Sequence, residues 1–379
     1  MGKITVSGKA FGQVTAPPSK SMAHRLLICA YLSGGSTVHG LAESEDINAT
    51  RDCLKALETG ETLNCRESGS TLRFMIPLCL VKGTPFTLTG TKRLFSRSLE
   101  VYETLCKKQG IEYVSKEDSL YINGKLRGGE ISVRGDISSQ FISGLCFALP
   151  LVDTDSVITI TNGFESVNYV DMTLQAMNTF GIDIRRCDNK IFIKGNQTYK
   201  KTEVTVEGDW SNAAFFDALN LLGSDVKVTN LDTESLQGDK IYREYYKLIE
   251  NGCPVLDITN YPDLGPILMA LGAACHGVTL TGTKRLAIKE SDRGRVMAEE
   301  LKKFGVRVTV EENRISVSGG INTPTECLFG HNDHRIVMAL SVLLTVSGGS
   351  IEGFEAVAKS FPDFFERLES LGVKISYEA

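Results

Sequence analysis

An internal repeat constrains the fold of this chain more than any other feature. The heptapeptide LTGTKRL occurs at Leu88–Leu94 and again 192 residues later, at Leu280–Leu286. The similarity extends upstream, because FMIPLCLVKGTPFTLTG from Phe74 aligns with PILMALGAACHGVTLTG from Pro266 at the same offset. The chain has 379 residues, so this offset is about half its length. We therefore expect two similar domains that arose by duplication.

Each half divides again into three units of alternating strand and helix. The segment that begins at Ser21 aligns with the segment that begins at Ser211, at an offset of 190. A short β-like run opens a helical segment six times, near Val38, Leu88, Ile160, Val228, Leu280 and Ile351. The intervals of 50, 72, 68, 52 and 71 residues pair unit one with four, two with five, and three with six. This pattern predicts an α/β (α+β) fold of six βαβ-type units, three per domain.

The first strand places the domain boundaries. The run Lys3–Val6 has no β partner nearby in sequence, so we expect it to pair with strands of the last domain. One domain is then discontinuous and comprises residues 1–17 and 209–379, and the other comprises residues 18–208. The chain is expected to cross between them near 16–19 and 206–209.

Every unit also contains a second helix that is apolar almost all round. Its first turn is polar or small, as in Ser19-Lys20-Ser21 before RLLICAYL and Ser68-Gly69-Ser70 before LRFMIPLCL. Such helices lie inside a domain. If the units follow a local three-fold axis, these helices run parallel and aim their N-termini at one end of each domain, at an inter-domain cleft. Helix N-termini attract anions, although the same residues could be simple caps.

Basic residues recur at these helix starts and at the turns after the LTG motif. They are Lys20, Arg25, Arg73, Arg97, Lys289, Arg293, His334, Arg335 and Lys359. A cation at a helix N-terminus opposes the macrodipole at a cost of ~0.3–1 kcal/mol. Repeated at corresponding turns, this arrangement predicts a polyanionic ligand with phosphate and carboxylate groups.

Two carboxylates in the same turns are candidates for acid–base chemistry. Glu290 lies between Lys289 and Arg293 in the sequence. These neighbouring charges can keep it ionised or tune its pKa, as proton transfer requires. The alternative for Glu290 is an i, i+3 ion pair at an exposed helix end. Asp263 occupies a helix-start position, so the alternative for Asp263 is a capping role.

Composition excludes several other classes. Lys plus Arg number 41 against 46 Asp plus Glu, so a general nucleic-acid-binding surface is not expected. Neither a membrane-length apolar run nor an N-terminal signal segment is found, and GxGxxG and P-loop patterns are absent. The ten cysteines form no CxxC pair or zinc-type cluster, and Cys29, Cys79, Cys146 and Cys275 lie in apolar stretches as expected for buried residues. We expect a cytoplasmic, metal-free protein without a cofactor.

The strings PPSKSMAHR, SSQF, KESDR, NDHR and KSFPDFF, in this order, closely resemble the 5-enolpyruvylshikimate-3-phosphate synthase family. The resemblance covers nearly the whole chain. It implies transfer of the enolpyruvyl group of phosphoenolpyruvate to the 5-hydroxyl of shikimate 3-phosphate, with release of phosphate through a tetrahedral intermediate. It also implies two domains, each of three βαβαββ-type units with buried parallel helices. No cofactor, nucleic acid or membrane is implied, and we expect a monomer.

The resemblance implies an acceptor site by position. The residues that would bind shikimate 3-phosphate are Lys20, Ser21, Arg25, Ser138, Ser139, Gln140, Ser166, Tyr169, Asp263 and Lys289. Among them, Ser138, Ser139 and Ser166 would bind the 3-phosphate, and Tyr169 would flank the ring.

The donor site follows in the same way. The residues that would bind phosphoenolpyruvate are Lys20, Gly69, Arg97, Gln140, Arg293, Arg335 and Lys359. Arg97 and Lys359 would hold the phosphate, Arg293 and Arg335 the carboxylate, and Gly69 would allow close approach to the backbone.

The implied catalytic residues are Asp263, Glu290 and Lys20. Asp263 would accept the proton of the attacking hydroxyl, and Glu290 would protonate the methylene carbon, with His334 beside them. How the protons are shared among Lys20, Asp263 and Glu290 stays open at this point.

The chain departs from the family pattern at several positions. Glu67-Ser68-Gly69-Ser70 stands where Asn-Ala-Gly-Thr is common, and Phe74 where Pro is usual. His24 and Arg285 occupy positions where Asn is usual or frequent. Units one and four are also short, which predicts trimmed closing β-hairpins.

Two alternative functions agree with part of this pattern. UDP-N-acetylglucosamine enolpyruvyl transferases share the architecture and the donor, but they usually carry a reactive Cys where this chain has Phe95-Ser96-Arg97-Ser98. A non-catalytic anion-binding repeat protein would account for the cations but not for Asp263 and Glu290.

Overall fold

The computed structural model describes residues 2–378, and the chain forms two compact units. One unit is Lys20–Val206. The other combines the N-terminal segment through Ser19 with the chain from Glu207 onward. The divisions lie at 19/20 and 206/207, and below we call the two parts the continuous unit and the discontinuous unit.

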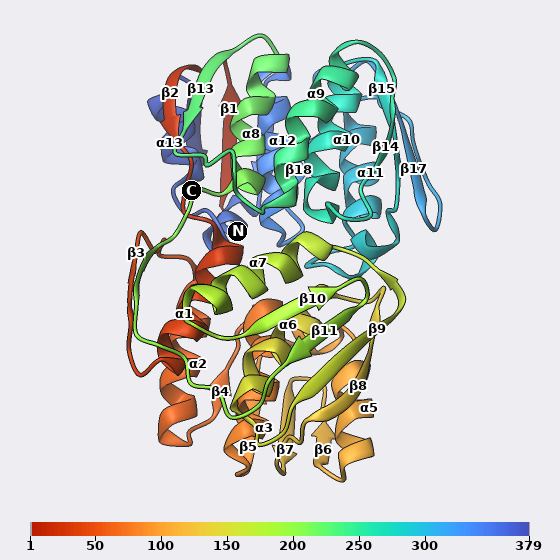
Figure 1. Cartoon of the computed structure of the whole chain (residues 1–379). Helices are drawn as coiled ribbons and strands as arrows, with labels where there is room; N and C mark the ends of the chain where they lie inside the picture. The colour runs from red at the N-terminus through yellow and green to blue at the C-terminus, as the bar shows by residue number, and fades with distance from the viewer. Residues whose placement is uncertain (1, 379) are drawn as a thin grey trace. The chain divides into compact units, whose positions relative to one another are not determined.

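The continuous unit contains three small sheets and their helices (Figure 1). In chain order its elements are α1 (Lys20–Leu32), β3 (Thr37–His39), α2 (Glu45–Thr59), β4 (Leu63–Asn64), α3 (Gly69–Lys82), β5 (Phe86–Thr89), α4 (Lys92–Phe95), α5 (Glu100–Gln109), β6 (Glu112–Ser115), β7 (Ser119–Asn123), β8 (Gly129–Gly135), α6 (Ser139–Ala148), η1 (Leu149–Leu151), β9 (Ser156–Phe164), α7 (Val167–Thr179), β10 (Ile184–Cys187), β11 (Lys190–Ile193) and β12 (Glu203–Thr205). The strand orders are β12-β3, β4-β5-β7-β6 and β10-β11-β9-β8.

The discontinuous unit repeats this plan. Its elements are β1 (Lys3–Ser7), β2 (Phe11–Thr15), α8 (Trp210–Leu221), β13 (Asp225–Thr229), η2 (Gly238–Ile241), α9 (Tyr242–Glu250), β14 (Val255–Asp257), η3 (Pro262–Leu264), α10 (Gly265–Ala274), β15 (Gly277–Thr281), η4 (Lys284–Ile288), α11 (Arg293–Lys303), β16 (Val308–Val310), β17 (Arg314–Ser318), β18 (Leu328–Phe329), α12 (His334–Ser347), β19 (Gly349–Glu352), η5 (Phe354–Lys359), α13 (Phe364–Ser370) and β20 (Lys374–Glu378). The strand orders are β13-β2, β14-β15-β17-β16 and β18-β19-β1-β20.

The sheet pattern confirms the predicted duplication into three-part halves. Each unit has one two-stranded sheet and two four-stranded sheets, and β4-β5-β7-β6 matches β14-β15-β17-β16 in order. The two-stranded parallel sheets belong to units one and four, as their short sequences predicted. The first strand also pairs as predicted, because Ile4 lies opposite Ile351 of β19 and Tyr377 of β20.

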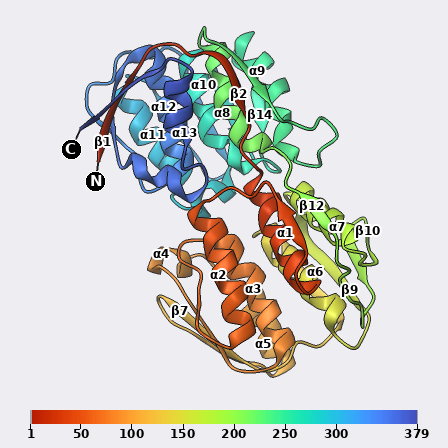
Figure 2. The same cartoon turned by 90° about the vertical axis from the view of Figure 1, so that its left-hand side faces the viewer.

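The second helix of each unit is buried, as its apolar sequence predicted. In α12 every residue from His334 to Thr345 is buried, and in α10 every residue from Gly265 to Ala273. Helices α8, α10 and α12 pack against one another in the discontinuous unit (Figure 1). In the continuous unit α2 packs against both α1 and α3, and α3 packs against α6 (Figure 2).

Side-chain caps begin four of these buried helices. Ser68, Ser138, Asp209 and Asp333 each accept a hydrogen bond from a backbone N–H in the first turn. The caps fix where each helix starts and so where its first side chains project.

The cysteine prediction holds for Cys29, Cys79 and Cys146, which are buried, but it is wrong for Cys275. Cys275 is half-buried because it ends α10 just before the turn into β15. Within the described part of the chain, no helix has the length and apolar character needed to cross a membrane.

Candidate active site

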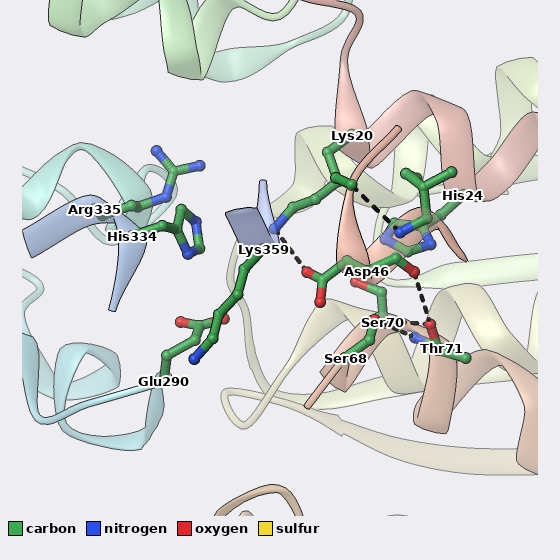
Figure 3. Close-up of polar contacts among 12 residues, drawn as sticks. Lys20, His24, Asp46, Ser68, Ser70, Thr71, Glu290, His334, Arg335 and Lys359 are labelled. Carbon is green, nitrogen blue, oxygen red and sulfur yellow. Dashed lines mark hydrogen bonds and ion pairs between the residues drawn. The ribbon is translucent and has the colours of Figure 1, made fainter. Parts of the chain in front are cut away.

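In the continuous unit, Lys20 opens α1 beside a carboxylate that the sequence analysis missed. Its Nζ lies 2.8 Å from Oδ2 of Asp46, in the first turn of α2 (Figure 3). The two side chains are only 16% and 15% exposed, so the ion pair is partly shielded from water. An acidic residue in a first helical turn is ordinary, and therefore the sequence carried no signal that Asp46 would meet Lys20.

A chain of buried polar groups lies beneath this ion pair. His24 Nδ1 is 2.7 Å from Thr50 Oγ1, and Thr50 Oγ1 is 2.7 Å from Thr71 Oγ1. Thr71 donates to Ser68 Oγ at 2.7 Å (Figure 3). Burial, followed by the charge of Lys20, holds the pKa of His24 well below its ordinary value. The neutral imidazole thus ties α1 to α2, and the threonines tie α2 to the start of α3.

Arg25 is almost fully buried, and its guanidinium is held by α7. Its Nε donates to Thr173 Oγ1 at 2.8 Å, Nη2 donates to Tyr169 O at 2.8 Å, and Nη1 donates to Ser21 O at 2.6 Å. The group also lies over the Phe74 and Tyr169 rings. Burial lowers the pKa of Arg25 to about 10, so it keeps its charge at neutral pH. Ser21, Arg25 and Tyr169 therefore form one group.

The start of α3 is crowded by two guanidinium groups. A Cβ on Gly69 would lie 2.6 Å from Arg97 Nη1 and 2.9 Å from Arg73 Nη1, so any other residue would displace both guanidinium groups. Gln140 donates from Nε2 to Ser70 Oγ at 2.8 Å and accepts from Arg73 Nη1 at 3.0 Å. The structure thereby brings Gly69, Arg97 and Gln140 together.

The three serines predicted for a phosphate begin two neighbouring helices. Ser138 caps α6 by accepting from the backbone N–H of Gln140 at 3.3 Å, and Ser139 follows it. Ser166 precedes α7 with a left-handed φ of 54°, and α7 packs against α6. Both helix starts offer backbone N–H groups near hydroxyl groups, which suits an anion.

In the discontinuous unit, Arg293 is the centre of the charged cluster. Its Nη1 lies 2.8 Å from Asp263 Oδ1, Nη2 lies 2.7 Å from Glu290 Oε2, and Nε lies 2.9 Å from Asp333 Oδ2. The side chain is 1% exposed. The i, i+3 pair with Glu290 is therefore present, but it is not the exposed helix-end pair that we weighed as an alternative. Burial disfavours the charged form, yet the three carboxylates, Asp333 first, raise the pKa of Arg293.

The capping alternative for Asp263 is wrong. Asp263 lies within the short helix η3, and neither η3 nor α10 has a side-chain cap. Its carboxylate instead contacts Lys289 Nζ at 3.1 Å, Arg293 at 2.8 Å and Arg335 Nη2 at 3.5 Å. Burial alone would raise the pKa of Asp263, but the cations, Lys289 first, hold it well below its ordinary value. Asp263 is thus an ionised group among cations.

Two further groups of this unit have pKa values that differ from their ordinary values. Burial lowers the pKa of Lys289 to about 8, against the opposing effect of Asp263. Burial, followed by the charge of Asp263, raises the pKa of Asp239 to about 6. Asp239 had no motif in the sequence to mark it, because its burial arises only when η2 packs against α8.

The remaining predicted residues of this unit flank the start of α12. His334 and Arg335 lie in its first turn (Figure 3). Asp333 caps the helix by accepting from Arg335 N at 3.0 Å. Arg335 Nη1 donates to Asp263 O at 3.3 Å. Lys359 ends η5, and its Nζ donates to Asn332 O at 2.7 Å. The structure thus gathers Asp263, Lys289, Glu290, Arg293 and Arg335 around shared contacts and anchors Lys359 to the adjoining turn. Among residues 2–378, no group of three or more His, Cys, Asp or Glu side chains is placed to hold a metal ion.

Solved structures with the same fold come from EPSP synthases. An EPSP synthase from Acinetobacter baumannii superimposes with a TM-score of 0.78 and 22% identity, and the match covers 100% of both chains. A second structure of the enzyme from that organism gives a TM-score of 0.76. These matches establish the two-part α/β fold, with three units about a pseudo-three-fold axis in each part.

The sequence comparisons define the family. Residues 4–368 match the family model described as EPSP synthase (3-phosphoshikimate 1-carboxyvinyltransferase). A 3-phosphoshikimate 1-carboxyvinyltransferase from Clostridium kluyveri is 40% identical over 410 residues, covering 97% of this chain and 96% of the relative. One from Clostridium botulinum strain Alaska E43 is 39% identical, covering 96% of each chain. The chain belongs to the EPSP synthase family, and neither alternative interpretation finds support in these matches.

The Arg293 cluster gives a stability prediction. Replacing Arg293 with Met leaves three carboxylates without their shared cation, so Arg293→Met should lower the free energy of unfolding by about 3–5 kcal/mol. Adding Asp333→Asn should restore part of the loss. Trp210, the single tryptophan, lies in the same unit, so its fluorescence during urea unfolding reports the change. Arg295→Met, which removes an exposed arginine of the same helix, serves as the control and should change little. Equal effects of the two variants would contradict the buried-cluster assignment.

Proposed function

We propose that this chain transfers the enolpyruvyl group of phosphoenolpyruvate to the 5-hydroxyl of shikimate 3-phosphate and releases phosphate, a step of the shikimate pathway. The observation that carries the proposal is a pair of charged clusters, one on each unit, with the residue types that two anionic substrates need. Family membership supports the same reaction.

The acceptor, shikimate 3-phosphate, is assigned to residues of both units. In the continuous unit, Ser138, Ser139 and Ser166 supply hydroxyl and N–H donors for its phosphate, and Arg25 is already oriented by Tyr169. In the discontinuous unit, Lys289 and Asp263 supply a cation and an acceptor for the ring hydroxyls. Lys20, Ser21 and Gln140 complete the acceptor set.

The donor, phosphoenolpyruvate, is assigned to the remaining cations. Arg97 beside Gly69, together with Lys20 and Lys359, suits its phosphate, since Lys and Arg groups near a helix start stabilise a departing phosphate. Arg335 and Arg293 suit its carboxylate. We infer that residues of both units act on the same pair of substrates.

The carboxylates divide the proton transfers. Asp263, which is ionised, accepts the proton of the 5-hydroxyl group. The oxygen of that hydroxyl group bonds to the central carbon of phosphoenolpyruvate at the same time. Glu290 protonates the methylene carbon, giving a tetrahedral intermediate. Cleavage of the carbon–oxygen bond to the phosphate releases phosphate, and return of a methyl proton to the Glu290 carboxylate restores the carbon–carbon double bond. We expect His334, in the first turn of α12, to lie beside these groups.

We infer that the protein works as a cytoplasmic monomer. Its substrates are small molecules, and its net charge of −5 argues against a nucleic-acid partner. Neither reaction partner requires a membrane or an additional cofactor.

The assay of choice is phosphate release from phosphoenolpyruvate. We expect turnover with shikimate 3-phosphate and none with UDP-N-acetylglucosamine. Glu290→Gln should reduce kcat by about 100-fold or more, because the proton donor is lost. Glu299→Gln changes an exposed glutamate of α11. It should leave kcat unchanged and serves as the matched control. Full turnover by Glu290→Gln would refute its role, and turnover with the sugar nucleotide alone would refute the proposed acceptor.

The pKa of Lys289 gives a pH prediction. Because this pKa is lowered to about 8, Lys289 loses its charge as pH rises through that value, and kcat/KM for shikimate 3-phosphate should fall. Lys289→Arg keeps the charge, so its pH profile should stay flat to higher pH. The free energy of unfolding should instead rise as pH increases from about 8 to about 10.4. In this range the unfolded chain still holds the Lys289 proton, whereas the folded chain has lost it. An unchanged alkaline limb in Lys289→Arg would contradict the assignment.

A further inference from the structure

The turn that precedes α12 has a strained backbone. His331 and Asn332 have φ values of 49° and 53°, so two successive non-glycine residues adopt the left-handed conformation. His and Asn are enriched in this region, but a side chain there still needs support from its surroundings. Whatever stabilises this turn also fixes the groups that follow it.

Two groups of the candidate site depend on the geometry of this turn. The carbonyl of Asn332 accepts the hydrogen bond from Lys359 Nζ at 2.7 Å. Asp333, the next residue, caps α12 and accepts from Arg293 Nε at 2.9 Å. A shift of the turn would therefore move Lys359 and the start of α12 together.

A buried carboxylate outside the predicted site supports the turn. Glu300 of α11 is 2% exposed and accepts from His331 Nε2 at 2.9 Å and from the backbone N–H of Phe329 at 2.9 Å. It also accepts from Lys303 Nζ at 2.9 Å, and the same Nζ donates to Cys327 O at 3.0 Å. The His331 ring further packs edge-on against Phe329, with ring centroids 4.9 Å apart.

Hydrogen bonds stabilise the ionised form of the Glu300 carboxylate. Burial would raise its pKa, but hydrogen bonds from His331, Lys303 and Phe329 outweigh this effect, so the pKa lies below the ordinary value. An ionised carboxylate is a stronger acceptor than a neutral one, and it holds both residues that flank Gly330. Seven residues separate Glu300 from Arg293, so both project from the buried face of α11.

We propose that Glu300 and His331 are positioning residues, which hold the left-handed turn so that Lys359 and the start of α12 are set for phosphoenolpyruvate. This inference rests on the proposed function, in which Lys359 and Arg335 bind the donor. It predicts a larger defect for the donor than for the acceptor, because Lys359 bonds directly to Asn332 of the turn, whereas Asp263 is linked to the start of α12 through the donor residues Arg293 and Arg335.

The test uses His331→Asn in the full chain. Asparagine accepts the left-handed backbone but is too short to reach Glu300. We expect KM for phosphoenolpyruvate to rise by about ten-fold, with KM for shikimate 3-phosphate changed by less than about two-fold. His331→Gln, whose amide N–H can reach the same carboxylate, should recover most of the affinity for the donor.

Lys303→Met is the matched control, because it removes hydrogen bonds of similar length to the same carboxylate and to Cys327 O, which precedes the left-handed residues His331 and Asn332. It should leave KM for phosphoenolpyruvate within about two-fold of the wild-type value. A purely structural role would lower the melting temperature of His331→Asn with both KM values unchanged, and that result would overturn the proposal. So would equal rises in both KM values. If the wild-type protein shows no turnover, the proposed function itself fails, which is a distinguishable outcome.

Discussion

Concentrated positive charge at the starts of buried helices is the interaction on which the structure depends. Backbone N–H groups already make these ends positive, and Lys20, Arg97 and Arg335 add full charges there. Carboxylates offset part of this charge, as Asp46 does for Lys20 and Asp263 does for Arg335. Such an arrangement favours anionic ligands, and a pair of phosphorylated, carboxylated metabolites supplies the complementary charge.

The duplicated scaffold explains how one chain produces two such clusters. Each unit places its apolar helices inside small sheets, and most charged residues of the candidate site lie at the starts of these helices and in the adjoining turns. Rigid buried supports then orient the charged groups: Thr173 and Tyr169 fix Arg25, and Asp333 fixes Arg293. Precision at the site thus comes from the same packing that stabilises each core.

Much of the fold could be predicted because it follows from local sequence patterns. The repeat gave the two halves, apolar runs gave α10 and α12, and the unpartnered first strand indicated its pairing with β19 and β20. The contacts of Asp46, Asp239 and Glu300 could not be predicted, since a single acidic residue carries no information about which distant cation or turn it meets. Asp263 lies in the first turn of η3, but its neighbours, rather than this position, determine what it contacts.

The central claim is that charged groups from both units bind the same substrate. Calorimetric titration of shikimate 3-phosphate into the wild-type protein, Arg25→Met and Lys289→Met tests it most directly, because the two residues belong to different units. We expect one binding site per chain and a loss of affinity of about ten-fold or more in each variant. Wild-type affinity in Lys289→Met, with binding lost only in Arg25→Met, would contradict a site built from both units.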